Sequence, residues 1–306
     1  MAEPSMIAPA TKAAPSAGVQ AIKRAVAGKS YWTRVRERLL ADRLTVAVST
    51  LLLIIIVMVL AAPVFATHDP TVGSVMARLK SPGYQGHWLG TDEVGRDLWS
   101  RILYGGRYSL LCGVVPVFLA LLIGGSLGLT AGFFGGVVNS VIMRSMDVLY
   151  AFPSILLAVA ICGMLGSGIG NTVLALTVTF IPPMVRISET VTSQVRGYEF
   201  VEAARASGAR PLSIIHFHIL NNVLGPILVY ATSLISISII LAAGLSFLGL
   251  GVTPPDTEWG LMLNNLRQAI WVNPLVAALP GAMIFITSMC FNLMSDGMRS
   301  AMDVRM

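Results

Sequence analysis

The chain has 306 residues, of which 55% are apolar and 12% are charged, and its formal net charge is +6. Its mean hydropathy is +0.76. A soluble domain carries about 25% charged residues, so this chain has too little charge to cover a surface that faces water. The composition excludes a soluble globular domain and indicates a protein largely embedded in a membrane.

Residues 1–43 form a tail that precedes the first apolar run. Residues 2–30 are rich in Ala, Pro, Ser and Lys, which is typical of disordered segments, so the tail is expected to be partly disordered. The run at 44–66 is either a transmembrane helix or a cleaved signal peptide ending at Val64-Phe65-Ala66. More than 40 residues precede this long run, which favours an uncleaved helix.

Long uncharged runs predict the membrane crossings, because one crossing needs about 20 apolar residues. The sequence therefore predicts an all-α polytopic membrane protein, in which an external loop (67–105) separates the first helix from a five-helix core (106–306). Pro153 lies inside the third crossing and is expected to kink it. The six predicted transmembrane helices are 44–66, 108–132, 142–165, 170–187, 222–247 and 274–295.

The distribution of basic residues predicts the orientation. With six crossings, both termini share one side, and this side holds 15 of the 21 Lys and Arg residues while the other holds 6. Cytoplasmic loops carry the excess of basic residues. Both termini are therefore predicted to be cytoplasmic, in a multi-pass protein.

Four glycines at a spacing of four mark the second predicted helix, namely Gly124, Gly128, Gly132 and Gly136. This spacing places them on one helix face, where small residues let a neighbouring helix approach closely. Close packing is favoured, and a role in lining a pore is the alternative.

Two charged residues, Arg144 and Asp147, lie three positions apart near the start of the third predicted helix, which is its predicted cytoplasmic end. That spacing allows an ion pair within one helix. A structural pair is favoured, and a role in gating or substrate contact is the alternative.

Energy-coupling and catalytic motifs are missing from the chain. Gly28-Lys29-Ser30 resembles the end of a phosphate-binding loop, but Lys23 stands where the loop needs a glycine. No catalytic residue and no metal-binding motif is identified. No predicted crossing has an ionisable residue near its centre, which argues against a carrier driven by protons or sodium.

The polar segment at about 190–220 is the most distinctive part of the chain. Val191–Ala206 is predicted to be a helix, Gly208 can adopt the left-handed conformation that ends a helix, and Pro211 suits the first turn of another. Glu202, Ala203 and Ala204 lie on the first of these helices. The segment is either a compact knob that fits the groove of another protein or a simple surface loop.

Hydroxyl side chains in the fifth predicted crossing are candidates for lining a transport pathway. Thr232 and Ser236 are four residues apart and share a helix face, and Ser233 lies close to it. A mildly polar, uncharged lining would suit a variable solute. The alternative is that these hydroxyls bond to their own helix or to a neighbouring one.

Four segments of the chain carry a family resemblance: Leu89-Gly90-Thr91-Asp92 with Gly95-Arg96-Asp97, Ser100-Arg101, Gly105, Arg107 and Ser109-Leu110; Glu202-Ala203-Ala204 with Gly208; Ser246–Gly251 with Pro254-Pro255 and Glu258-Trp259-Gly260; and Phe291-Asn292-Leu293 with Asp296-Gly297 and Arg299. Through these segments, residues 30–306 resemble the DppC/OppC-like permease subunits of the dipeptide/oligopeptide/nickel ABC importer family. Two residues depart from the family pattern, Asn221 and Val304, each where a proline is usual.

The resemblance implies a type I ABC importer permease fold with a cytoplasmic coupling helix, in the bacterial cytoplasmic (inner) membrane. Glu202, Ala203, Ala204 and Gly208 would couple the chain to an ATPase. The implied partners are a sister permease, two ATPase subunits that bind ATP and Mg, an extracytoplasmic substrate-binding protein and the lipid bilayer. No cofactor in this chain and no nucleic acid is expected.

The resemblance favours dipeptides or oligopeptides as the transported solute. Nickel or another small solute is the alternative within the family, and a self-sufficient secondary carrier is a distant alternative outside it.

Overall fold

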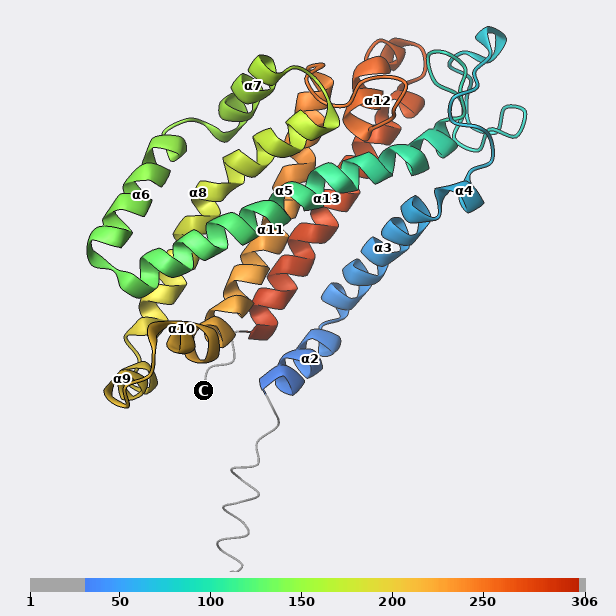
Figure 1. Ribbon diagram of the computed structural model, residues 1–306. Helices are drawn as coiled ribbons and strands as arrows, with labels where there is room; N and C mark the ends of the chain where they lie inside the picture. The colour runs from blue at the N-terminus through green and yellow to red at the C-terminus, as the bar shows by residue number, and fades with distance from the viewer. Residues whose placement is uncertain (1–30, 303–306) are drawn as a thin grey trace, which may run out of the picture.

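The computed structural model of the protein describes residues 31–302 as a bundle of helices, with no β-strand in that range (Figure 1). The predicted disordered segment, residues 2–30, lies outside the described residues. The helices in chain order are α2 (Tyr31–Ala41), α3 (Arg43–Leu60), α4 (Ala62–Phe65), η1 (Val75–Ala77), α5 (Leu98–Phe134), α6 (Gly136–Tyr150), α7 (Ser154–Leu165), α8 (Ile169–Arg196), α9 (Glu199–Ala206), α10 (Pro211–Ser213), η2 (Ile214–Ile219), α11 (Leu220–Phe247), α12 (Trp259–Asn265), η3 (Ala269–Trp271) and α13 (Pro274–Met302).

Five stretches of helix in the described range are long and apolar enough to cross a membrane, and α6 and α7 together would supply a sixth crossing. They are α3, α5, α8, α13 and the continuous stretch Pro211–Phe247. α5 starts ten residues earlier than the sequence predicts, because the Asp97 side chain caps it by accepting a hydrogen bond from the Ser100 amide at 2.8 Å. Its 37 residues make it about 55 Å long, more than a hydrocarbon layer of about 30 Å requires.

The prediction of one continuous third helix at 142–165 is wrong. α6 and α7 meet at an angle of 80° across residues 151–153. Pro153 has no amide hydrogen to continue the helical bonding and disfavours a helical conformation at the residue before it. These properties of proline allow a full break at this position, where the sequence predicted only a kink.

The predicted pairing of Arg144 with Asp147 is also wrong. Asp147 on α6 forms an ion pair with Arg186 on α8, at 2.5 Å between Oδ1 and Nη2. The Arg186 guanidinium also lies 4.9 Å from the centre of the Tyr150 ring. Both charged side chains are about half exposed, so their pairing adds little to stability, but it links α6 to α8.

The glycine stripe on α5 lies against α8. A Cβ atom on Gly124, Gly128 or Gly132 would come within 2.4–2.9 Å of a backbone oxygen of α8, so a larger residue would force the helices apart. The predicted close packing therefore holds for these three glycines. It is wrong for Gly136, which lies beyond the end of α5 and starts α6 with φ +51°.

The bundle has two different ends, which are named here by what they carry (Figure 1). The knob end holds α9, α10, the first described residues of α2 and the end of α13, and the loop end holds α4, α12 and the long segment 66–97. The described residues therefore begin and end on the same side of the bundle, as an even number of crossings requires.

Candidate functional site

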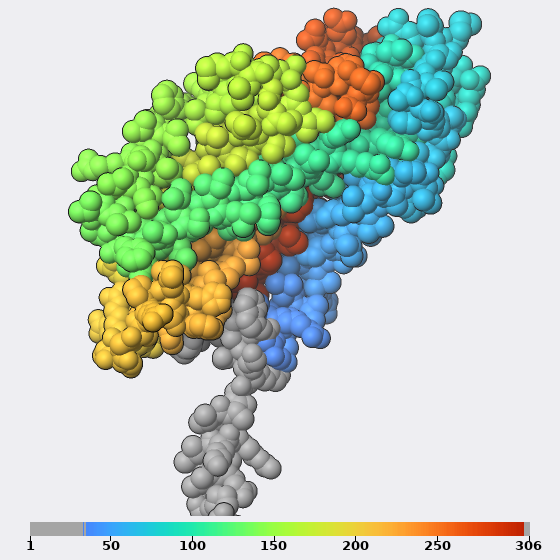
Figure 2. Space-filling model, viewed as in Figure 1, coloured from blue at the N-terminus to red at the C-terminus, as the bar shows by residue number. Residues whose placement is uncertain are grey.

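The knob comprises residues 197–219 and forms one corner of the molecule, coloured yellow to orange in Figure 2. It begins at Gly197, where α8 ends, and continues through α9, α10 and the π-helical turn η2 into α11. The predicted single helix Val191–Ala206 is wrong, because the chain turns at Gly197-Tyr198. Glu202, Ala203 and Ala204 consequently lie on a separate helix of 8 residues.

Gly208 ends α9 as the sequence predicts. Its φ is +77°, in the left-handed region that L side chains disfavour. The Gly208 amide donates to the Arg205 carbonyl at 3.0 Å, and the Ala209 amide donates to the Ala204 carbonyl at 3.1 Å. This pair of bonds is a Schellman motif, which fixes the direction in which the chain leaves the helix toward Pro211 at the first position of α10.

One face of α9 is anchored and the other is free. Val201 is fully buried, and Ala204 packs against the same apolar core. The Arg205 guanidinium lies 5.4 Å from the centre of the Phe133 ring at the end of α5. Glu202 and Ala203 are exposed, so the other face of α9 is accessible to a partner.

Sequence reasoning missed the apolar side chains around this surface. Exposed fractions reach 78% for Leu212 and 64% for Phe217, and Tyr198 and Phe200 are also exposed. Large apolar side chains grouped on an exposed surface are a common sign of a protein interface. Their occurrence within the chain's main polar loop was the signal available in the sequence.

The predicted pathway residues lie on the middle of α11. Thr232 donates its hydroxyl to the Leu228 carbonyl at 2.9 Å, Ser233 to Tyr230 at 2.7 Å and Ser236 to Ser233 at 2.7 Å. All three hydroxyls thus bond back to their own helix. Ser236 is only 6% exposed, whereas Thr232 and Ser233 are half-buried.

At the loop end, residues of two segments that carry the family resemblance hold the backbone in place. Asp92 accepts hydrogen bonds from the Val94 and Arg96 amides and from the Arg96 side chain, and its Oδ2 lies 3.1 Å from Nε of the buried Arg101. The buried Glu258 caps α12 and accepts from the Ser109 hydroxyl at 2.9 Å. These contacts tie the segment 66–97 and α12 to the start of α5.

Asp97 is a further buried carboxylate in this region. Burial alone would raise the pKa of its carboxyl group, but hydrogen bonds from Ser100, His87 and Thr67 lower the pKa overall. The carboxylate is therefore ionised at neutral pH. Its negative charge also stabilises α5, because it lies at the positive, N-terminal end of the helix dipole.

Comparison with known proteins places the chain in a family. Residues 124–306 match the model of the binding-protein-dependent transport system inner membrane component, and residues 30–82 match the N-terminal TM domain of oligopeptide transport permease C. The chain is similar to the glutathione transport system permease protein GsiD of Pectobacterium atrosepticum, with 40% identity over 91% of this chain and 92% of the relative.

A second relative and a solved structure agree with this assignment. The probable D,D-dipeptide transport system permease protein DdpC of Escherichia coli is 41% identical over 85% of this chain and 87% of its own length. The inward-facing methionine ABC transporter MetNI shares the fold, with a TM-score of 0.55 and 20% identity over 66% of this chain and 96% of that one. The fold is therefore that of ABC importer permeases, and the chain belongs to the family of binding-protein-dependent transport system inner membrane components.

Proposed function

We propose that this chain forms half of the translocation pathway of an ATP-driven importer for dipeptides or oligopeptides. The observation that carries the proposal is the knob, a capped helix that is anchored on one face and exposed on the other. Peptide uptake is favoured over nickel because the relatives are named for the transport of glutathione and a D,D-dipeptide.

The proposal assigns the energy source to partner subunits. A sister permease encloses the pathway together with this chain, and two ATPase subunits bind ATP and Mg. A binding protein delivers the peptide from the other side of the membrane. The ATPase subunits grip α9 through Glu202, Ala203 and Ala204, with Gly208 holding the helix in position.

Movement of the knob reaches the membrane through its two connections. On one side α9 follows α8, and on the other η2 continues without a break into α11, so that Pro211–Phe247 forms one helical stretch. Asn221, which stands where a family proline is usual, has the amide hydrogen that continuous helical bonding requires. A displacement of α9 is therefore carried into both α8 and α11.

A reconstituted complex tests the proposal. Vesicles would contain this chain, its sister permease and both ATPase subunits, with the binding protein and labelled glutathione or dialanine on the opposite side from the knob. Uptake that needs both ATP and the binding protein is expected. Uptake by the permease subunits without ATP would identify a secondary carrier, and uptake of nickel in place of peptide would overturn the substrate class.

The pathway is proposed to pass the face of α11 that carries Thr232, Ser233 and Ser236. Ser233 is a better probe of this face than Ser236, because the Ser233 side chain is half-buried whereas the Ser236 side chain is buried. Ser233→Trp is expected to block peptide uptake in these vesicles while leaving basal ATP hydrolysis intact, because the indole fills the passage. Ser233→Ala keeps the passage open and should transport normally; normal uptake by the tryptophan variant would instead assign this face to packing or lipid contact.

The knob end and both termini are proposed to be cytoplasmic. Ser81 in the segment 66–97 and Ser207 in the knob are both exposed, whereas the native Cys112, Cys162 and Cys290 are buried. In intact cells whose outer membrane has been made permeable, Ser81→Cys should therefore react with a membrane-impermeant thiol reagent against a low background. Ser207→Cys should react only after the inner membrane is opened, and the reverse pattern would invert the topology.

A further inference from the structure

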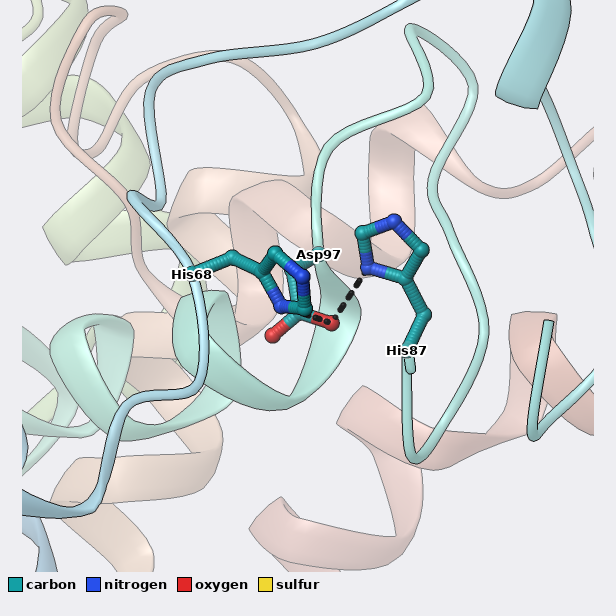
Figure 3. A group of neighbouring side chains, drawn as sticks. All are labelled: His68, His87 and Asp97. Carbon is teal, nitrogen blue, oxygen red and sulfur yellow. Dashed lines mark hydrogen bonds and ion pairs between the residues drawn. The ribbon is translucent and has the colours of Figure 1, made fainter. Parts of the chain in front are cut away.

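Two histidines and an aspartate meet at the loop end, far from the knob (Figure 3). His87 Nδ1 lies 2.8 Å from Asp97 Oδ1, and His68 Nδ1 lies 3.8 Å from the same oxygen. The two imidazole rings stack with their centres 4.3 Å apart. One potential ligand atom from each of the three residues lies within 4.8 Å of the other two. Sequence reasoning assigned no role to either histidine.

Three separate segments hold these side chains in place. The chain around His68 is fixed by a hydrogen bond from its amide to the Ser100 hydroxyl at 3.2 Å and by one from the Thr67 hydroxyl to Asp97 at 3.1 Å. His87 follows a tight turn in which Gly86 has φ +88°. Asp97 is fixed as the cap of α5. The three groups are therefore held together before any ligand arrives.

We propose that His68, His87 and Asp97 form a binding site for one divalent first-row transition ion, for which zinc is the best match. Zinc takes imidazole nitrogens at about 2.0–2.1 Å and carboxylate oxygens at about 2.0–2.2 Å. In a tetrahedral site these bond lengths separate neighbouring ligand atoms by about 3.4 Å. The observed separations of 2.8 and 3.8 Å from Asp97 Oδ1 lie on either side of this value.

Two small movements would complete the geometry: the His87 and Asp97 ligand atoms, now 2.8 Å apart, must separate slightly, and His68, at 3.8 Å, must move closer. The His68 side chain is 40% exposed, whereas that of His87 is 14% exposed and that of Asp97 is fully buried. The ion would replace the hydrogen bond between the buried Asp97 carboxylate and the mostly buried His87 imidazole, and the more exposed His68 imidazole would close onto it. Three protein ligands also leave a fourth position for water, as in many zinc sites.

An open cavity gives the ion a route to the site. The cavity has a volume of about 530 Å³ and is lined by His68 and His87, with Asp69 and Tyr84 also on its wall. Asp69 adds a further negative charge beside the entrance, which favours the approach of a cation. The bound ion would join the segment after α4, the turn before His87 and the start of α5, and so stabilise the loop end.

Zinc binding to the purified full chain tests this proposal. The chain is prepared without a histidine tag, stripped with a chelator, titrated with zinc chloride and analysed by calorimetry and by metal content after desalting. One zinc per chain is expected. His68→Gln and His87→Gln should each weaken zinc binding at least about 10-fold, since even residues outside the ligand set can change metal affinity 10- to 100-fold.

His216→Gln is the matched control, because His216 is an exposed histidine at the opposite end of the molecule. This variant should bind zinc as the unaltered chain does, and zinc should raise its melting temperature equally. His68→Gln changes an exposed side chain, so it should fold normally and lose the zinc-dependent stabilisation. Unaltered zinc binding in His68→Gln, or no zinc bound by the unaltered chain, would overturn the proposal. The hydrogen bond between His87 and Asp97 would then serve only to hold the loop in place.

Discussion

Gly208→Val is expected to uncouple ATP hydrolysis from peptide transport while leaving insertion of the chain intact. The position has φ +77°, and a left-handed conformation costs an L residue roughly 1–2 kcal/mol, more for a β-branched one. Apart from Gly208 itself and its two chain neighbours, no residue has an atom within 4 Å of the position that a Cβ would occupy. The strain is therefore confined to the backbone, and it acts on the Schellman motif that directs the chain from α9 to α10.

The expected loss of transport follows from the size of this strain. A change of about 1.4 kcal/mol alters an equilibrium 10-fold, so peptide uptake in the reconstituted vesicles should fall about 10-fold or more. Expression and assembly should stay normal, because α9 lies outside the membrane helices. ATP hydrolysis should continue but no longer respond to the loaded binding protein.

Gly208→Asn is the control. It shows whether transport is lost because the backbone is strained or because glycine has been replaced by any other residue. Asparagine adopts the left-handed conformation more readily than other side chains, and the open space at this position accommodates it. This variant should retain most of the transport. Equal activity of the valine variant and the unaltered chain would show that the end of α9 plays no part in coupling.

Gly128→Ala is expected to destabilise the transmembrane bundle itself. The added Cβ would lie 2.4 Å from the Val185 carbonyl oxygen and 2.6 Å from the Ser188 Cβ, both on α8. Neither backbone nor Cβ atoms can move aside without displacing α8. Overpacking of this kind costs about 1–3 kcal/mol, which should appear as a lower melting temperature and a lower yield of folded protein in detergent.

Gly125→Ala is the matched control, three residues before Gly128 on the same helix. The nearest atom to its added Cβ is the Leu121 Cδ1 at 3.7 Å, an ordinary contact. Helix propensity alone favours alanine over glycine in both variants. The Gly125 variant should therefore be as stable as the unaltered chain, and equal melting temperatures for both variants would show that α5 and α8 do not pack tightly through Gly128.

The chain's local chemistry predicts the type of fold and the end of α9. Uncharged runs favour membrane crossings because a charged residue in lipid is expensive, and this reasoning gave the approximate places of the five long apolar helices in the described residues. Gly208 was predicted to have positive φ from its place between a helix and Pro211, because backbone sterics are local. The orientation derived from basic residues and the pathway role of Thr232, Ser233 and Ser236 stay predictions.

Only the tertiary structure determined the features that depend on contacts between segments far apart in the sequence. Asp147 pairs with Arg186, 39 residues away, because the packing of α6 on α8 brings them together, whereas helical spacing suggested Arg144. The 80° break at Pro153 likewise reflects where α7 finds its neighbours, since proline by itself permits either a kink or a break. His68, His87 and Asp97 come from three segments with no shared spacing, so no periodicity in the sequence could reveal their meeting.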